Sequence, residues 1–122
     1  ETFNYKNISG YDISLVFVSD KYLSDLKKKY FKMNQYTDVI AFRLNEYGAP
    51  FVEGEVYISL ARAKENAKIF DEPYSREVSR LIIHGCLHLI GLKDKTNKEK
   101  ENMTNNEDAI LKEINWAGLF KD

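Results

Sequence analysis

The sequence predicts a single α+β domain. Three observations support this class: the length of 122 residues, three short runs that favour strands, and a long apolar segment with helical spacing at 73–91. Hydrophobic residues make up 43% of the chain, which is typical of a globular protein. Repeats and linkers are not evident, so we expect one domain over residues 1–122. The chain begins with Glu1 rather than Met, which leaves open a missing N-terminal segment.

Three runs are rich in the β-branched and aromatic residues that favour strands. They are Ile13–Val18 (ISLVFV), Thr37–Phe42 (TDVIAF) and Glu55–Leu60 (EVYISL). Residues 44–50 contain a glycine and a proline, so we expect a turn there that can carry a short edge strand.

The first predicted helix follows the first strand. Ser19 and Asp20 can cap a helix that runs to about Phe31, with Tyr22 and Leu23 on its apolar side. Further helices are predicted at 61–70 and at about 97–114.

Two local signals refine the later helices. Thr96 and Glu99 have the spacing of a capping box at the start of the last helix. The segment that begins near Pro73 and ends at Gly91 is apolar almost all round, which is typical of a helix buried in the centre of a domain.

This central segment carries both histidines of the chain, His84 and His88. Residues four apart lie on one face of a helix, so both imidazoles can reach one ion. Gly91 can adopt a positive φ and turn the chain, and Asp94 could then fold back to supply an oxygen ligand. Two histidines and one carboxylate with an open position are typical of a catalytic zinc site. The alternative is that both histidines are core residues bonded to the backbone.

The chemistry of such a site differs from that of a helical zinc peptidase. In those enzymes a glutamate follows the first histidine and acts as general base, whereas Gly85 stands here. Glu77 is on the same helical face as His84 but about 10 Å away along the axis, too far for direct proton transfer. A zinc ion can still bring the pKa of a bound water towards about 7.

Composition indicates the redox compartment and limits the kinds of partner that we expect. Cys86 is the only cysteine, so a disulfide framework is excluded and a reducing cytoplasm is expected. We interpret Cys86 as a small buried apolar residue. A net charge of −1 gives no global attraction to nucleic acid, and apolar runs are too short to cross a membrane.

The motif around the histidines resembles the signature of the YbeY family of rRNA-maturation endoribonucleases. Residues 84–91 (HGCLHLIG) match every fixed position of His-Gly-x-Leu-His-Leu-x-Gly. Residues 30–42 (YFKMNQYTDVIAF) are similar to the family's Thr-Asp-Val strand, 54–67 (GEVYISLARAKENA) to its next strand and helix, and Met103 to its following helix.

Two departures from the family pattern concern the site. The third ligand, usually histidine, would here be Asp94, and Leu92 and Lys93 replace a Tyr-Asp pair. An arginine thought to engage RNA phosphate is replaced by Phe31, for which Lys29, Lys32 or Arg43 would have to substitute.

The resemblance implies a zincin-like α+β fold, in which a small mixed sheet packs on a central helix bearing His84 and His88. It also implies a single-strand-specific endoribonuclease with one Zn²⁺ per chain, bound by these histidines and Asp94. The activity would serve rRNA maturation and ribosome quality control. The partners would be ribosomal RNA and the small subunit or its assembly factors, in the cytoplasm.

On this interpretation Asp38 is a catalytic candidate, although a carboxylate that caps a strand end is an equal alternative. Lys93, Lys95 and Arg43 are the candidates for binding RNA phosphate. If Asp94 were not the third ligand, Asp108 or Glu99 would be the next acids to consider.

Other functions stay open at this point. A non-catalytic ribosome-assembly factor could keep a structural metal, and a metallopeptidase-like hydrolase could use the same ion. Non-haem iron oxygenases also bind their metal through two histidines and one carboxylate.

Overall fold

The computed structural model describes residues 10–31, 38–47 and 49–114. Its three strands are β1 (Gly10–Val18), β2 (Val39–Arg43) and β3 (Phe51–Ser59). Its helices are α2 (Asp20–Phe31), α3 (Leu60–Ile69), α4 (Tyr74–Leu89) and α5 (Asn97–Glu113). The strands form one sheet in the order β1-β3-β2, where β3 runs parallel to β1 and antiparallel to β2.

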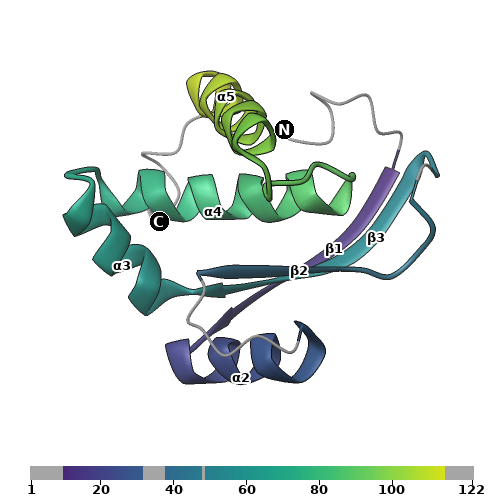
Figure 1. The fold of residues 1–122 in the computed structure, drawn as a ribbon, viewed down its shortest axis with the longest axis horizontal. Helices are drawn as coiled ribbons and strands as arrows, with labels where there is room; N and C mark the ends of the chain where they lie inside the picture. The colour runs from purple at the N-terminus through teal and green to yellow at the C-terminus, as the bar shows by residue number, and fades with distance from the viewer. Residues whose placement is uncertain (1–9, 32–37, 48, 115–122) are drawn as a thin grey trace.

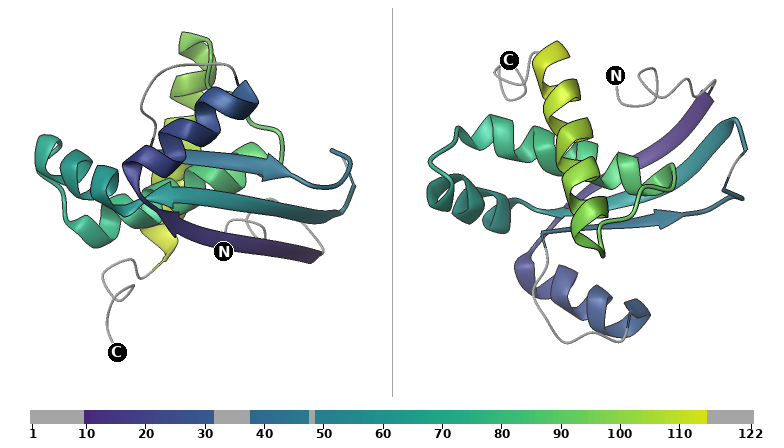
Figure 2. Two further views of the ribbon diagram at one scale, coloured as in Figure 1. Left: turned by 90° about the horizontal axis from the view of Figure 1, so that it is seen from below. Right: turned by 45° about the horizontal axis from the view of Figure 1, so that its top comes forward.

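The elements are arranged in layers around this sheet. Helix α2 covers one face, α4 crosses the other, and α5 lies on the far side of α4 (Figure 1). The two turned views in Figure 2 show the same order of layers. The prediction of an α+β fold, with a small mixed sheet on a central helix, is confirmed.

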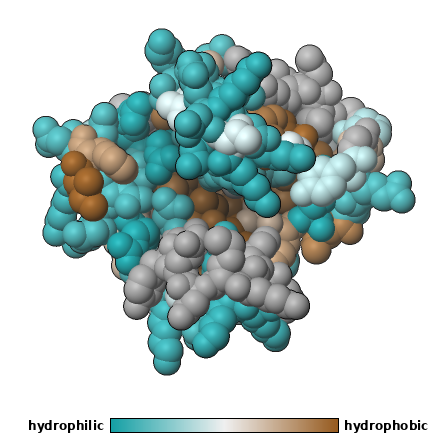
Figure 3. Space-filling model, viewed as in Figure 1, coloured by the Kyte–Doolittle hydropathy of each residue, from teal (hydrophilic) through white to brown (hydrophobic). Residues whose placement is uncertain are grey.

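Helix α4 is apolar almost all round because it is buried on two sides. Its stripe of Val78, Leu81 and Leu89 packs with Val56 and Ile58 of β3. A second core joins α4 to α5, and its members are Ile83, Leu87, Met103, Ile110 and Leu111. The outward surface of α5 is hydrophilic, and apolar side chains are visible in the hollow beneath it (Figure 3).

Close packing of α4 on the sheet depends on Gly85. A Cβ atom at this position would lie 2.5 Å from Cγ1 of Val56 and 3.3 Å from Cγ2 of Val39. A side chain therefore has no room here, which explains a glycine in the middle of a helix despite its poor helix propensity.

The end of α4 is a Schellman motif, and it redirects the chain beside the histidines. Gly91 has a φ of +105°, as the sequence predicts. Its N–H donates to the carbonyl of His88 (3.0 Å), and the N–H of Leu92 donates to that of Leu87 (3.0 Å).

Most expected elements are confirmed with shifted ends. Strands β1 and β3 begin earlier than predicted, at Gly10 and Phe51, because their register pairs these residues. The Thr96–Glu99 capping box is present. The prediction that Tyr22 packs on the apolar side of α2 is wrong, since 51% of this residue is exposed while Leu23 is fully buried.

Two further expectations concern the segments that flank β2. The described part of 44–50 contains no strand. Thr37, predicted as the first residue of the second strand, lies outside the described residues. As for the membrane, none of the described helices combines the length and the apolar character that a crossing requires.

We predict that Gly85→Ala destabilises the protein by about 1–3 kcal/mol, because the new methyl group overlaps Val56. In an ordinary helix the same change would stabilise by about 1 kcal/mol. Urea unfolding measures the difference. In a Val56→Ala background the cost should shrink, since the overlapping methyl is gone. An equal cost in both backgrounds would contradict the packing explanation.

Candidate metal centre

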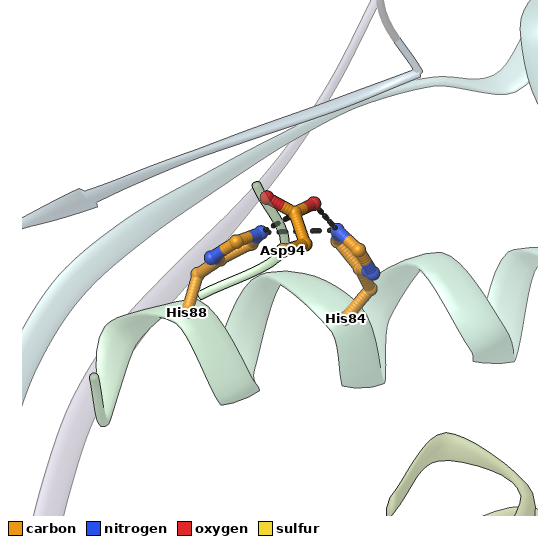
Figure 4. Close-up of side chains that lie close together, drawn as sticks. All are labelled: His84, His88 and Asp94. Carbon is orange, nitrogen blue, oxygen red and sulfur yellow. Dashed lines mark hydrogen bonds and ion pairs between the residues drawn. The ribbon is translucent and has the colours of Figure 1, made fainter. Parts of the chain in front are cut away.

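The side chains of His84, His88 and Asp94 converge on one point (Figure 4). Nε2 of His84 lies 3.0 Å from Nε2 of His88, and each of these atoms lies 3.3 Å from Oδ2 of Asp94. The three predicted ligand residues are therefore brought together in a nearly equilateral triangle of donor atoms.

The triangle has the dimensions of one face of a zinc tetrahedron. Zinc binds imidazole nitrogen at about 2.0–2.1 Å, so two ligands of a tetrahedral ion lie about 3.3–3.4 Å apart. The observed separations of 3.0–3.3 Å are close to that edge. Three such ligands leave a fourth position open. The cluster could hold one divalent cation and a small molecule beside it.

Local structure explains how the triangle forms. The helical spacing of His84 and His88 places both rings on one side of α4, with ring centroids 4.6 Å apart. The positive φ of Gly91 then turns the chain back along the helix, so that Asp94 reaches both rings.

Both imidazoles are oriented through their other nitrogen. Nδ1–H of His84 donates to Oε2 of Glu107 (2.5 Å), and Nδ1–H of His88 donates to the carbonyl oxygen of Leu92 (2.9 Å). We assign the tautomers from these acceptors. Each Nε2 then carries a lone pair that points into the triangle, which is the usual arrangement around a protein-bound metal.

Glu107 belongs to a buried ionic network centred on Arg80. Arg80 donates to Glu77 through Nε (2.8 Å) and Nη2 (2.6 Å), and its Nη1 lies 3.3 Å from Oε1 of Glu107. Both glutamates are almost fully buried. The hydrogen bond to Glu77 and the nearby carboxylates hold the pKa of Arg80 well above its ordinary value, despite burial. A permanent positive charge therefore offsets the burial of these acids.

The same network sets the electrostatics of His84. Burial lowers the pKa of His84, but the hydrogen bond and charge of Glu107, with a contribution from Asp94, outweigh it and raise the pKa overall. The surroundings of this ring thus favour positive charge, as an imidazolium or as an adjacent cation.

Asp38 lies at the outer end of this network and is not one of the three converging residues. Its Oδ2 accepts a hydrogen bond from Nδ2 of Asn66 (3.1 Å) and lies 3.9 Å from Nη2 of Arg80. Nδ2 of Asn66 also donates to Glu77 (3.0 Å). The Asp38 side chain is 32% exposed, so it faces solvent while its hydrogen bond to Asn66 holds its position.

The predicted cationic residues lie in two places. Lys93 and Lys95 are exposed on the loop, on either side of Asp94. Arg43 is engaged by the protein itself, since its guanidinium donates to the carbonyls of Leu89 (2.5 Å) and Glu46 (2.8 Å) and to the side chain of Asn45 (2.6 Å).

The acids considered as substitutes for Asp94 have other roles. Asp108 lies 3.8 Å from Arg76, and Glu99 forms the capping box of α5. Cys86 is buried as expected, and burial raises the pKa of its thiol to about 12, so it stays protonated. Position 85 faces Val56, so a base in the peptidase position would point into the sheet.

Sequence reasoning missed Glu107, and it missed the roles of Arg80 and Asn66. A signal for Glu107 exists in hindsight. This acid shares the buried face of α5 with Met103, Ile110 and Leu111. A carboxylate at an apolar position of a helix marks a buried acid with a partner.

The family model described as "Endoribonuclease YbeY" matches residues 1–115. The chain belongs to the YbeY family. The resemblance noted in the sequence is thereby confirmed.

Among YbeY relatives, the endoribonuclease YbeY of Cytophaga hutchinsonii is 40% identical over 100 residues, which cover 82% of this chain and 69% of that one. The Christiangramia forsetii endoribonuclease YbeY is 41% identical over the same length, 82% of this chain and 68% of that one. The solution structure of a Thermotoga maritima protein matches with a TM-score of 0.59 and 26% identity, over 91% of this chain and 75% of that one.

We predict that Glu107→Gln weakens zinc binding about 10- to 100-fold, because the amide still accepts the His84 N–H but lacks the charge. Glu101→Gln, an exposed position on the same helix, is the matched control. Competition with a chromophoric chelator measures both affinities. Equal affinity for the wild type and Glu107→Gln would contradict a role of Glu107 in orienting the ligand.

Proposed function

We propose that this chain, as one domain over residues 1–122, is a zinc-dependent endoribonuclease that cleaves single-stranded ribosomal RNA. Membership of a family whose relatives are named endoribonucleases supports the activity. The observation that carries the metal dependence is the triangle formed by His84, His88 and Asp94, with both imidazoles held at Nδ1.

The donor set favours zinc. Imidazole nitrogen and one carboxylate oxygen suit a borderline ion, and the spacing suits a tetrahedron. The charges around the site also favour a cation: Asp94 contacts both imidazoles and Glu107 contacts His84, whereas the Arg80 guanidinium is shared between Glu107 and Glu77. A divalent cation offsets this excess of carboxylates. When bound, zinc polarises a phosphoryl oxygen and lowers the pKa of a coordinated water to about 7.

The chain's own residues would orient and bind the substrate. The acidic surroundings of the triangle repel a phosphodiester, so cations must lie at its approach. Lys93 and Lys95 flank Asp94 and are exposed, and we assign them to phosphate contacts. We do not assign Arg43 a direct phosphate contact, because its guanidinium is bonded within the protein.

Asp38 is the carboxylate we propose for proton transfer at the edge of the site. Asn66 and Arg80 hold it in place, and its partial exposure leaves it accessible to substrate. Its charge also contributes to the raised pKa of His84, which places it within electrostatic reach of the triangle.

We further propose a cytoplasmic role in rRNA maturation and ribosome quality control, with the small subunit or its assembly factors as partners. A specific observation favours one alternative, a non-catalytic assembly factor with a structural metal. The glutamate that acts as general base in helical zinc peptidases is replaced by Gly85, and Val56 fills the space that a side chain at position 85 would need.

RNA cleavage separates these two functions. We expect the zinc-loaded wild type to cleave single-stranded RNA. His88→Ala should lose at least about 100-fold in rate, because removing a metal ligand should cost at least as much activity as removing a residue that hydrogen-bonds to a ligand. Lys64→Ala, an exposed change on α3, is the control. Gel analysis of a labelled RNA gives the rates. Cleavage that is equal in wild type and His88→Ala would rule out the nuclease.

The third ligand is tested by metal retention. Asp94→Ala should lose zinc on dialysis against a weak chelator, because only two protein ligands stay. Asp94→His should keep or tighten the ion, since imidazole is a good third ligand. Elemental analysis of protein purified without added metal gives identity and occupancy. Full zinc occupancy in Asp94→Ala would place the third ligand elsewhere.

A further inference from the structure

The turn between β2 and β3 lies beside the loop that carries Asp94 (Figure 1). Arg43 joins them. Its Nη1 donates to the carbonyl oxygen of Leu89 in the last turn of α4, and its other donors hold Asn45 and Glu46 of the turn. The turn is thereby fixed relative to the metal centre.

The Arg43 side chain also contacts the ring of Tyr47. The guanidinium carbon of Arg43 lies 5.0 Å from the ring centroid, over one face. The edge of the ring, at Cδ1, lies 3.9 Å from the point where a Cβ of Gly91 would stand. Yet 61% of Tyr47 is exposed. An exposed aromatic ring that has a cation against one face and lies beside Gly91 offers a surface on which a base can stack.

The ring is within reach of a substrate bound at the triangle. Gly91 precedes Asp94 by three residues, so their Cα atoms are at most about 11 Å apart. At about 3.4 Å per stacked nucleotide, this upper limit corresponds to at most about three nucleotides. Lys93 lies between these two residues, and Lys95 directly follows Asp94.

We propose that Tyr47 stacks with a base of the single-stranded RNA substrate, within about three nucleotides of the cleaved phosphate. The proposal rests on the proposed function and adds a binding residue to it. Unpaired bases stack on aromatic rings, whereas the bases of a duplex are already stacked on each other. Tyr47 would thus favour single strands and bind many sequences.

A protein partner is the competing occupant, since Leu44 and Phe51 are also exposed nearby. Charge favours RNA. Arg43, Lys93 and Lys95 bring three cations to this area, against Glu46 in the turn and Asp94 in the loop, and a bound divalent cation would offset the charge of Asp94.

The test measures binding of the zinc-loaded protein to a fluorescein-labelled, single-stranded 2′-O-methyl RNA dodecamer, by anisotropy at fixed salt. A second probe has the same backbone with abasic residues throughout. Tyr47→Ala and Tyr47→Leu should bind the dodecamer about 5- to 100-fold more weakly than wild type. Tyr47→Phe and Tyr47→Trp should bind within about twofold, because any aromatic ring stacks.

Two controls exclude a folding effect. Phe70→Ala removes an equally exposed aromatic residue at the end of α3 and should bind as the wild type does. The Tyr47 variants should melt within about 3 °C of wild type, as expected for an exposed side chain. Abasic RNA should bind wild type and Tyr47→Ala equally, since it offers nothing to stack.

Two results would overturn the stacking role: unchanged dodecamer affinity in Tyr47→Ala and Tyr47→Leu, or an equal loss for the dodecamer and the abasic probe. Cleavage of unmodified RNA by the wild type reports separately on the proposed function. If the wild type cleaves and the Tyr47 variants bind normally, only the stacking role fails. If the zinc-loaded wild type does not cleave RNA at all, the proposed function fails.

Discussion

The contact between α4 and the sheet at Gly85 is the constraint on which the site depends. Because position 85 has no side chain, the helix lies directly against Val56 of β3. One side of α4 is then committed to the sheet and another to α5. The imidazoles of His84 and His88 project between these contacts, where Asp94 can reach them. The packing of one helix thus sets both the core and the ligand geometry.

The second determinant is electrostatic. Glu107 orients His84. Arg80 bonds to both Glu107 and Glu77, and its positive charge offsets the energetic cost of burying these two carboxylates. Asn66 extends the same set of bonds to Asp38. Each acid has a partner on another element, so contacts within the protein set the geometry of the site. Such preorganisation reduces the cost of binding an ion and of orienting a substrate.

The parts that sequence reasoning predicted are those with local causes. Helical spacing places His84 and His88 on one face, and a positive φ at Gly91 is a local requirement of the turn that returns Asp94. The capping box at Thr96 is equally local. Tyr22 shows the limit of such reasoning: its type suggested burial, whereas the packing of α2 buries its neighbour Leu23 instead.

The features that sequence reasoning missed depend on contacts between segments that are distant in the chain. Glu107 meets His84 only because α5 crosses α4, and the sequence separation of 23 residues carries no trace of this contact. The sequence suggests RNA binding for Arg43, because the residue is a cation. Its acceptors are mostly backbone carbonyls, which every residue has, so the sequence could not identify them.

The central claim is that two imidazoles and one carboxylate bind a single tetrahedral ion. X-ray absorption spectroscopy of the zinc-loaded protein tests it most directly. We predict a first shell of four nitrogen and oxygen atoms at about 2.0–2.1 Å, with the multiple-scattering signal of two imidazoles. A sulfur at about 2.3 Å, or six oxygen ligands without imidazole, would contradict the account.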